Sequence, residues 1–435
     1  MGMVVKNNLG AVRTLNTLNQ NSSALQKSLA KVSSGMKINS AQDDASGYAI
    51  SERMRVRIRS LDQANQNTQN DASMMKTAEG AIANTVELLR TLKEKAINSA
   101  NDSNTAEDRL TIQKEVDQFI DQVDDNALVQ FNGKYLVDGS NNNVATATKT
   151  ILLNQSLATN TASNSALTDL KDRSGNSLEI ISTDTYQVSW VMNGITSTSS
   201  GQVGTDNNLG GLLNAVGTIS VATNSTTAIG TNKFGADVYT PDKTSGVALL
   251  ASTTGVTSQV SGFTISIMDQ NGNVKKAANA ALDQFKQYQA AENASDNYTK
   301  KTLNFHIGSE ANVAIKVGIG DMRAESLGLK GSNGEKLSVT TKDNANAAIN
   351  VIENALTKAL DQQTTIGAIE ARLEYTSTNL TTSSENVQAA ESTIRDADMA
   401  KEMTNYTKAN VLLQAAQAML AQANQNSSAV LSLLQ

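Results

Sequence analysis

The chain has 435 residues and a formal net charge of −6, with one His, one Pro, one Trp and no Cys. Aromatic residues make up 3% of the composition, and because large aromatic side chains bury the most surface per residue, their scarcity argues against thick globular cores. The negative charge gives no basic surface for nucleic acid or acidic membranes. The lack of cysteine excludes disulfides and thiolate chemistry, and no uninterrupted apolar run approaches the ~20 residues that span a bilayer.

The first ten residues lack the apolar core and the small-residue cleavage site of a Sec-type signal peptide. Lys6 stands where an N-myristoylation signal needs Ser or Thr. These rules on their own predict a cytoplasmic protein, and export routes that leave no such mark stay open.

The N-terminal zone, residues 4–104, has the apolar spacing of amphipathic helices, and a further helix is expected over 107–128. Ser33-Ser34-Gly35 interrupts the first apolar stripe, and Phe131-Asn132-Gly133-Lys134-Tyr135 predicts a turn after the last helix. The first stripe comprises Val5, Leu9, Val12, Leu15, Leu18, Leu25, Leu29 and Val32, and the stripe after the interruption runs through Ile50, Met54, Ile58, Leu61, Met75, Ala78, Ile82, Val86, Leu89, Leu92 and Ala96.

The C-terminal zone, residues 344–435, mirrors the first. A continuous helix over 344–394 would be roughly 75 Å long at ~1.5 Å per residue, so it needs a partner helix, which the N-terminal zone can supply. Its heptad seam comprises Ile366, Ile369, Leu373, Thr376, Leu380, Ser383, Val387, Ala390 and Ile394. A second stripe follows at Met399, Met403, Tyr406, Asn410, Leu413 and Leu420.

The zone between them is rich in Gly, Asn, Ser and Thr and alternates with the period of a strand. Alternating runs before Asn193-Gly194 and before Asn271-Gly272, and the pair of runs at 303–307 and 313–319, predict hairpins. The expected fold is therefore mainly α with a β-rich insertion. Both chain ends would form a long helical coiled-coil rod that carries an outer β-rich domain.

Each chain end has one strong apolar face and one polar face rich in Asn, Gln, Ser and Ala. An intramolecular helical hairpin explains this pattern, and so does a pair of segments that become ordered only among neighbouring copies. Alanines at 415, 416, 418, 421 and 423 permit close helix approach. The residues predicted to carry self-assembly are Val5, Leu9, Val12, Leu25, Leu29, Met403, Tyr406, Leu413 and Leu420.

Several segments resemble the bacterial flagellins, in the order that the family has them. They cover residues 3–140 and 303–435, and together they are far more specific than any one alone. They are Ser33-Ser34-Gly35-Met36-Lys37-Ile38-Asn39-Ser40-Ala41-Gln42-Asp43-Asp44-Ala45, Phe131-Asn132-Gly133-Lys134, Ile319-Gly320-Asp321-Met322-Arg323, Leu327-Gly328-Leu329, Ile394-Arg395-Asp396-Ala397-Asp398, Ala418-Met419-Leu420-Ala421-Gln422-Ala423-Asn424 and Val430-Leu431-Ser432-Leu433-Leu434.

The resemblance implies a non-enzymatic subunit that polymerises into the extracellular flagellar filament for motility, after export unfolded through a type III channel. Residues 1–43 with 397–435 would form the terminal inner-tube domain, disordered before assembly. Residues 44–140 with 303–396 would form the rod domain with a β-hairpin, and residues 141–302 would project outward as the variable domain. The implied partners are copies of the chain and the flagellar cap, hook-junction and export-chaperone proteins.

No catalytic, cofactor or metal site is expected. His306 is the only histidine and lies in a strand-like run, which excludes an HExxH zinc site. Asp269 begins a segment like a calcium loop, but its glycine falls at position four and the later Glu is missing, so a hairpin turn is favoured. Arg395, Lys401 and the nearby carboxylates of Asp396, Asp398 and Glu402 are interpreted as a solvated or inter-subunit ion-pair face.

One surface resembles the stretch that the vertebrate flagellin-sensing Toll-like receptor binds in the family. Thr91 stands where the family has its central arginine, and Phe119 replaces a basic residue on the facing helix. Because arginine forms bidentate, desolvated contacts that threonine cannot, weak receptor activation is hypothesised. The alternative is that these residues only line contacts between subunits. The surface comprises Leu89, Arg90, Thr91, Glu94, Glu115 and Gln118.

Two other functions fit parts of the pattern. A hook-associated junction protein shares terminal helices with flagellin but would not grow long filaments by itself. A secreted adhesin would carry its function in residues 141–302, where Trp190, Tyr186 and Tyr239 could form a sugar platform, although core packing explains them as well.

Overall fold

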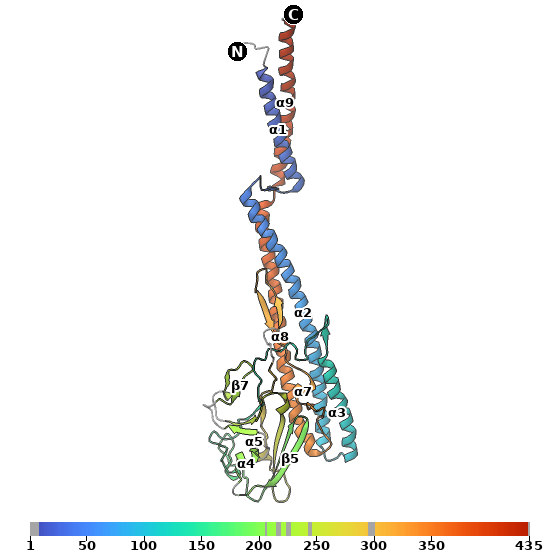
Figure 1. The fold of residues 1–435 in the computed structure, drawn as a ribbon, viewed down its shortest axis with the longest axis vertical. Helices are drawn as coiled ribbons and strands as arrows, with labels where there is room; N and C mark the ends of the chain where they lie inside the picture. Colours follow the sequence, from blue (N-terminus) through green and yellow to red (C-terminus); the bar gives the residue numbers. More distant parts are fainter. Residues whose placement is uncertain are drawn as a thin grey trace. The chain divides into compact units, whose positions relative to one another are not determined.

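The computed structural model describes residues 8–204, 207–214, 219–222, 228–241, 246–294 and 301–433, and Val5 lies outside them. The chain forms two compact units, one of Met1–Asn67, Ile307–Val313 and Tyr375–Gln435 and the other of Thr68–His306 and Ala314–Glu374. Long helices come from both chain ends and strands from the centre of the chain (Figure 1). The predicted fold class, mainly α with a β-rich insertion, is confirmed.

Four long helices account for most of the helical content: α1 (Leu9–Ser34), α2 (Ala45–Ala100), α8 (Lys342–Arg395) and α9 (Met399–Leu433). The first ends because Gly35 adopts the left-handed conformation, with φ of 72°, and its amide donates to the carbonyl of Lys31. The unbroken helix predicted over 344–394 is present as α8.

Helices α2 and α8 are long because each has a seam of three-four spacing without a break. On α2 the seam is filled by fully buried residues such as Met75, Ile82 and Leu89, and on α8 by Ile366 and Leu373. In one unit, Ser384 Oγ donates to Asp62 Oδ1 at 2.9 Å beside a cluster of Leu61, Ala64, Leu380 and Val387. In the other unit, Lys93 Nζ pairs with Glu353 Oε2 at 3.2 Å and Lys342 Nζ pairs with Asp102 Oδ2 at 2.6 Å, so the two helices run antiparallel.

Helix α3 (Ala106–Ala127) agrees with the helix predicted over 107–128. It begins with a capping box, in which the side chains of Thr105 and Asp108 each bond the other's backbone amide. Its inward side buries Val116, Ile120, Val123 and Ala127. The predicted turn follows as a short hairpin of β1 (Gln130–Phe131) and β2 (Lys134–Tyr135).

The insertion contains a three-stranded sheet in the order β10-β4-β5, a four-stranded sheet in the order β11-β3-β9-β6, and the pair β7-β8. Short helices α4 (Leu209–Asn214) and α5 (Lys276–Leu282) and two 3₁₀ turns (Leu167–Asp169 and Val256–Ser258) connect the strands. The strands are β3 (Ile151–Asn154), β4 (Thr185–Met192), β5 (Ile195–Gln202), β6 (Ile219–Ala222), β7 (Gly230–Thr231), β8 (Asp237–Val238), β9 (Val247–Ala251), β10 (Val260–Met268) and β11 (Lys286–Gln289).

The hairpin predicted at Asn193-Gly194 is confirmed as β4 and β5, whereas at Asn271-Gly272 the predicted turn is present but a helix instead of a second strand follows it. After β10 the chain makes a tight turn, in which Asp269 Oδ1 accepts hydrogen bonds from the amides of Asn271 and Asn273. A single bridge, between Met268 and Val274, follows before α5 begins. Strand β10 pairs instead with β4, because its apolar face joins that of a strand much earlier in the chain.

The insertion has a larger core than the scarcity of aromatic residues predicted. Leu, Val and Ile side chains from both larger sheets bury one another around Phe263, whose ring meets Phe285 edge to face at 5.0 Å. Trp190 and Tyr186 pack against this core, whereas Tyr239 is exposed. The three aromatic side chains therefore do not form the sugar platform that an adhesin would need.

The hairpin predicted from the runs at 303–307 and 313–319 is present as β12 (Leu303–His306) and β13 (Ala314–Val317), followed by α7 (Ala324–Leu327). His306 is exposed on β12. Among the residues described, no helix combines the length and the apolar character needed to cross a bilayer.

Asp71 occupies a seam position of α2, between Thr68 and Met75, and its Oδ2 is buried without a hydrogen-bond partner. Burial raises its pKa from 3.8 to about 6. Because the folded chain then holds a proton that the unfolded chain releases, stability is lost as pH rises from about 4 to about 6. We expect Asp71→Asn to increase the free energy of unfolding at pH 7.5 by about 1 kcal/mol, allowing for solvent screening.

Urea denaturation at pH 7.5 and pH 4 checks this expectation, since the gain should vanish at the lower pH. Asp125→Asn, at an exposed position on α3, is the matched control and should change stability at neither pH. An equal gain from Asp71→Asn at both pH values would show that the charge of Asp71 is not the cause.

Candidate self-assembly interface

Helix α1 faces α9 with a mixed seam of small, polar and apolar side chains, packed closely along the pair. None of the residues of α1 whose burial is described is fully buried. Apart from Ser22 and Lys31, the partly buried positions of α1 recur with alternating steps of three and four, which is the spacing of one coiled-coil face. They are Ala11, Thr14, Leu18, Asn21, Leu25, Ser28 and Val32.

The face of α9 that packs against α1 alternates larger side chains with alanine. Ala409 and Ala416 are 7% and 6% exposed, and they are the fully buried residues of this helix among those whose burial is described. Alanine at alternate seam positions lets two helix backbones approach closely. The whole seam comprises Glu402, Tyr406, Ala409, Leu413, Ala416, Leu420 and Ala423.

Polar contacts at three points fix the pair as antiparallel. Asn8 Nδ2 donates to the carbonyl of Ala423 at 3.2 Å, while Asn8 Oδ1 caps α1 by accepting from the amide of Ala11. In the middle, Asn21 Nδ2 donates to the carbonyl of Leu412 at 3.2 Å. At the far end, Lys31 Nζ lies 3.6 Å from Glu402 Oε1.

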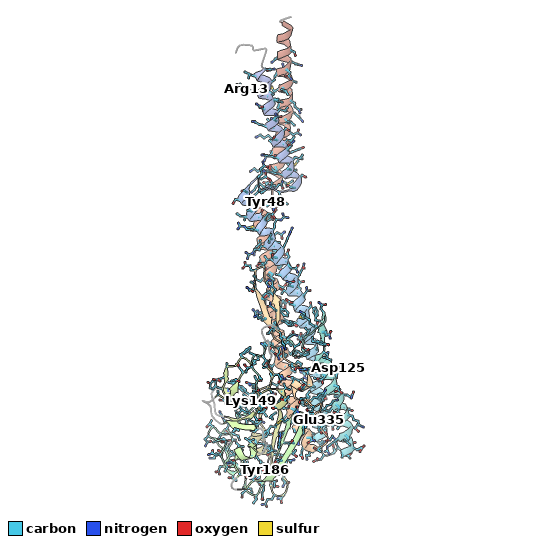
Figure 2. All side chains as sticks on the ribbon, in the orientation of Figure 1. Arg13, Tyr48, Asp125, Lys149, Tyr186 and Glu335 are labelled. Atoms are coloured by element: carbon cyan, nitrogen blue, oxygen red, sulfur yellow. The ribbon has the colours of Figure 1, made fainter. Side chains whose placement is uncertain are left out.

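Side chains project from both helices on more sides than the one that faces the partner (Figure 2). Large apolar side chains are among those outside the seam on both helices. Val12 and Leu15 are 53% and 46% exposed on α1, and Met419 is 63% exposed on α9. Two helices can cover only one face of each other, so these side chains have no partner in the pair. The exposed set, called the outward face below, is Leu9, Val12, Leu15, Leu29, Met399, Met403, Val411, Leu412 and Met419.

The structure separates the predicted self-assembly residues into two groups. Leu25, Tyr406, Leu413 and Leu420 lie on the seam between the two helices. Leu9, Val12, Leu29 and Met403 lie on the outward face. The sequence stripes thus combined residues from two different sides of each helix.

A compact joint connects this pair with the adjoining ends of α2 and α8. Met36 and Asp396 form an antiparallel bridge, in which the amide of Lys37 donates to the carbonyl of Arg395 at 2.7 Å. The amide of Ala397 donates to the carbonyl of Gly35 at 2.9 Å. The two connecting segments therefore hold each other by backbone bonds that any sequence could form.

Arg395 is a buried side chain with specific contacts in the joint. It is 6% exposed, its Nη1 lies 2.6 Å from Glu52 Oε1, and its guanidinium lies 5.4 Å from the ring centroid of Tyr48. The hydrogen bond from Arg395 holds the pKa of Glu52 below its ordinary value. The prediction of a solvated or inter-subunit ion-pair face is wrong for Arg395, and for Glu402, which pairs with Lys31 of the same chain.

The predicted receptor-binding stretch is only partly a surface. Leu89 is completely buried in the seam of α2 and is available to no partner, because its heptad position faces inward. Arg90, Glu94, Glu115 and Gln118 are exposed and Thr91 is half-buried. Glu115 already pairs with Lys95, and Arg90 pairs with Glu87, within the chain.

Among the described residues, no three His, Asp or Glu side chains are placed together as a metal site. The sequence analysis included Ala416 among the alanines that permit close helix approach, but it missed Asn21 and Ala409, which lie on the same seam. The spacing of seven between Ala409, Ala416 and Ala423 was the available signal, but it is weaker than an apolar stripe.

Comparisons with known proteins cover most of the chain. The model of the bacterial flagellin N-terminal helical region matches residues 5–142, and that of the C-terminal helical region matches residues 349–434. The flagellin of Clostridium tyrobutyricum is 34% identical over 97% of this chain and 99% of its own length. That of Bacillus subtilis is 30% identical over 99% and 100%. A flagellar junction protein from Legionella pneumophila has a solved structure with 15% identity and a TM-score of 0.32, over 80% of this chain and 100% of its own.

Proposed function

The chain belongs to the bacterial flagellin family and is a structural subunit of the flagellar filament, and we propose that it polymerises through the outward face of the α1/α9 pair. The observation that carries this proposal is that the pair fully buries small side chains but leaves large apolar side chains exposed. Its interior is closed by Ala409 and Ala416, whereas residues as large as Leu9 and Met419 stay more than 60% exposed.

Energetics favour association over an isolated pair. Burial stabilises by roughly 25 cal/mol per Å² of apolar surface, or about 1.5–3 kcal/mol for a whole Leu or Met side chain. The two alanines are the fully buried seam residues among those described, and the Leu and Tyr positions of the seam are only partly buried, so the pair gains little from this term. Short helical assemblies without a core are marginal. Neighbouring copies that cover the outward face would supply the missing burial, with the same surface repeated in every subunit.

The layered arrangement of flagellins extends the proposal to the rest of the chain. Residues 1–43 with 397–435 would form the inner tube, residues 44–140 with 303–396 the surrounding rod layer, and residues 141–302 the outer domain. Such a subunit is not an enzyme. It would be secreted through the type III route with an export chaperone, and it would meet the cap and hook-junction proteins at the ends of the filament.

The two other functions have less support. The curated relatives that match nearly the whole chain are named as flagellins, which favours a filament subunit over a hook-associated junction protein. An adhesin would need an exposed binding surface in the insertion, but Trp190 and Tyr186 contribute to the packing of its core.

Replacing two residues of the outward face tests the proposal. In the double variant Leu15→Gln with Met419→Gln, neither side chain lies on the seam, so the monomer should keep its helix content. Polymerisation should weaken at least tenfold in critical concentration, because about 1.4 kcal/mol of lost burial suffices for a factor of ten. Sedimentation and electron microscopy of the purified full chain measure the effect.

The matched control is Asn16→Gln with Gln417→Asn, which changes exposed polar positions on the same two helices. It should polymerise as the unmodified chain does. The proposal fails if the Leu15/Met419 double variant polymerises at the same concentration as the unmodified chain.

The receptor hypothesis leads to a gain-of-function test. Thr91→Arg restores the arginine that the family has at this position, next to exposed Arg90 and Glu94. Potency in a cell reporter assay for the flagellin-sensing Toll-like receptor should rise about tenfold or more, which is the effect of one bidentate arginine contact at an interface.

Thr77→Arg is the matched control, because Thr77 is also half-buried on α2 and also donates its hydroxyl to the carbonyl four residues before it. It should leave potency unchanged. Potency of the unmodified chain equal to that of an enteric flagellin would refute the hypothesis of weak activation.

A further inference from the structure

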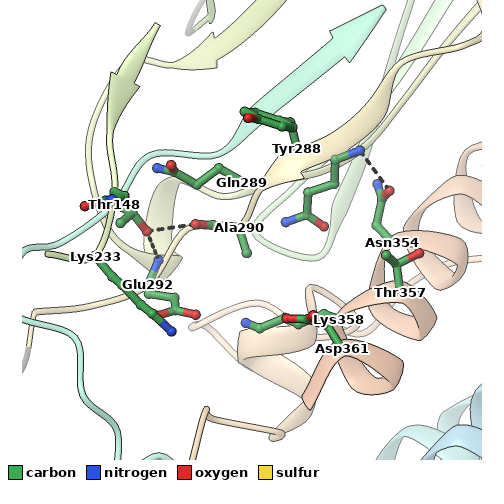
Figure 3. Close-up of a pocket in the computed structure, with 12 residues that line it drawn as sticks. Thr148, Lys233, Tyr288, Gln289, Ala290, Glu292, Asn354, Thr357, Lys358 and Asp361 are labelled. Carbon is green, nitrogen blue, oxygen red and sulfur yellow. Dashed lines mark hydrogen bonds between the residues drawn. The ribbon is translucent and has the colours of Figure 1, made fainter. Parts of the chain in front are cut away.

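A cavity of about 470 Å³ lies between the β-rich insertion and α8, within one compact unit. Its walls come from α8 and from the segment around β11, and Figure 3 shows Tyr288 on one side with Lys358 and Asp361 opposite. This volume is in the range of small-molecule sites. The residues that matter below are Lys233, Gln287, Tyr288, Glu292, Lys358 and Asp361.

Lys358 brings a cation into this cavity without a counter-ion in contact. Its Nζ donates to the carbonyl and the hydroxyl of Ser326, at 2.9 and 2.8 Å. Among the described residues, no carboxylate lies within 4 Å of it. Burial lowers the pKa of this lysine. An ammonium has three donors, so one N–H is left for an acceptor that the chain does not supply.

Gln287 adds a second unsatisfied donor to the same wall. Its Nε2 is buried and has no hydrogen-bond partner. The backbone amide of Gln287 donates to Asn354 Oδ1 at 3.3 Å, which ties this part of β11 to α8 (Figure 3). Buried amide groups are nearly always hydrogen-bonded in folded proteins, so an unpaired amide nitrogen in a cavity wall indicates a place for a ligand oxygen.

The lining of the cavity has no net charge, so a ligand carboxylate is favoured by its position beside Lys358 and not by the overall charge of the cavity. Two cations, Lys233 and Lys358, are balanced by two carboxylates, Glu292 and Asp361. The lining contains no arginine and is not built on a helix N-terminus, both of which phosphate sites commonly use. The side chain of Tyr288 is 43% exposed and offers an aromatic face to the organic part of a ligand.

We propose that this cavity binds a small organic monocarboxylate, whose oxygens accept hydrogen bonds from Lys358 Nζ and Gln287 Nε2. The rest of the ligand packs beside Tyr288. This site is separate from the α1/α9 pair, so its test does not depend on polymerisation.

Benzoate and benzamide form a matched pair of probes, because they share shape and differ in the carboxylate. Ligand-observed NMR on the full-length monomer should show benzoate binding about tenfold or more tightly than benzamide, the advantage of a charge-assisted hydrogen bond. Lys358→Met should weaken benzoate binding about tenfold, and Gln287→Leu several-fold. Lys286→Met changes an exposed lysine outside the cavity and should have no effect.

Circular dichroism verifies that each variant is folded, and Gln287→Leu serves alone if Lys358→Met does not fold. Equal binding of benzoate and benzamide would overturn the proposal. So would undiminished benzoate binding by both cavity variants, or competition for the cavity by inorganic phosphate with no binding of benzoate.

Discussion

The close contact between α1 and α9 is the constraint on which the assembly surface depends. Ala409 and Ala416 on one helix, facing a seam that includes Thr14 and Ser28 on the other, leave room only for a narrow interface. Some large apolar side chains, such as Leu25 and Leu413, lie partly buried on the seam, but others, such as Val12 and Met419, lie outside it and stay exposed. The same packing that joins the two chain ends thus creates the surface that only another molecule can cover.

The rest of the helical structure is stabilised differently. Met75, Ile82 and Leu92 on α2 are completely buried, as are Ile366 and Leu373 on α8, so these helices satisfy their apolar seams within the subunit. Arg395 links the α1/α9 pair with α2, because it is buried at the joint and pairs with Glu52 near the start of α2. On the proposal made above, such a subunit has one self-sufficient part and one part whose stability depends on neighbouring copies.

The long helices were predictable because their seams are regular. The three-four spacing through Ile366, Leu373 and Leu380 sets the face of α8, and Gly35 marks the end of α1. The orientation of α1 was not predictable, because its true seam contains Thr14, Asn21 and Ser28 and looks polar in the sequence. Apolar periodicity identifies a helix face that is buried somewhere, but it does not tell burial within a chain from burial between chains.

Local turn signals were similarly limited. Asn193-Gly194 and Asn271-Gly272 are identical dipeptides, yet one joins two paired strands and the other precedes α5. The difference lies in the segment that follows each turn, because Ile195–Gln202 continues as a strand whereas the alanine-rich Lys276–Leu282 forms a helix. Nor could the sequence reveal that Glu402 meets Lys31, since that contact depends on the antiparallel register of the two chain ends.

Hydrogen–deuterium exchange on monomer and filament tests most directly whether the terminal pair depends on neighbours. Amides of α1 and α9 should exchange quickly in the monomer and become strongly protected in the filament, whereas those at the centres of α2 and α8 should be protected in both. Equal protection of α1 and α9 in the monomer and in the filament would contradict the assignment of the outward face as the polymerisation surface.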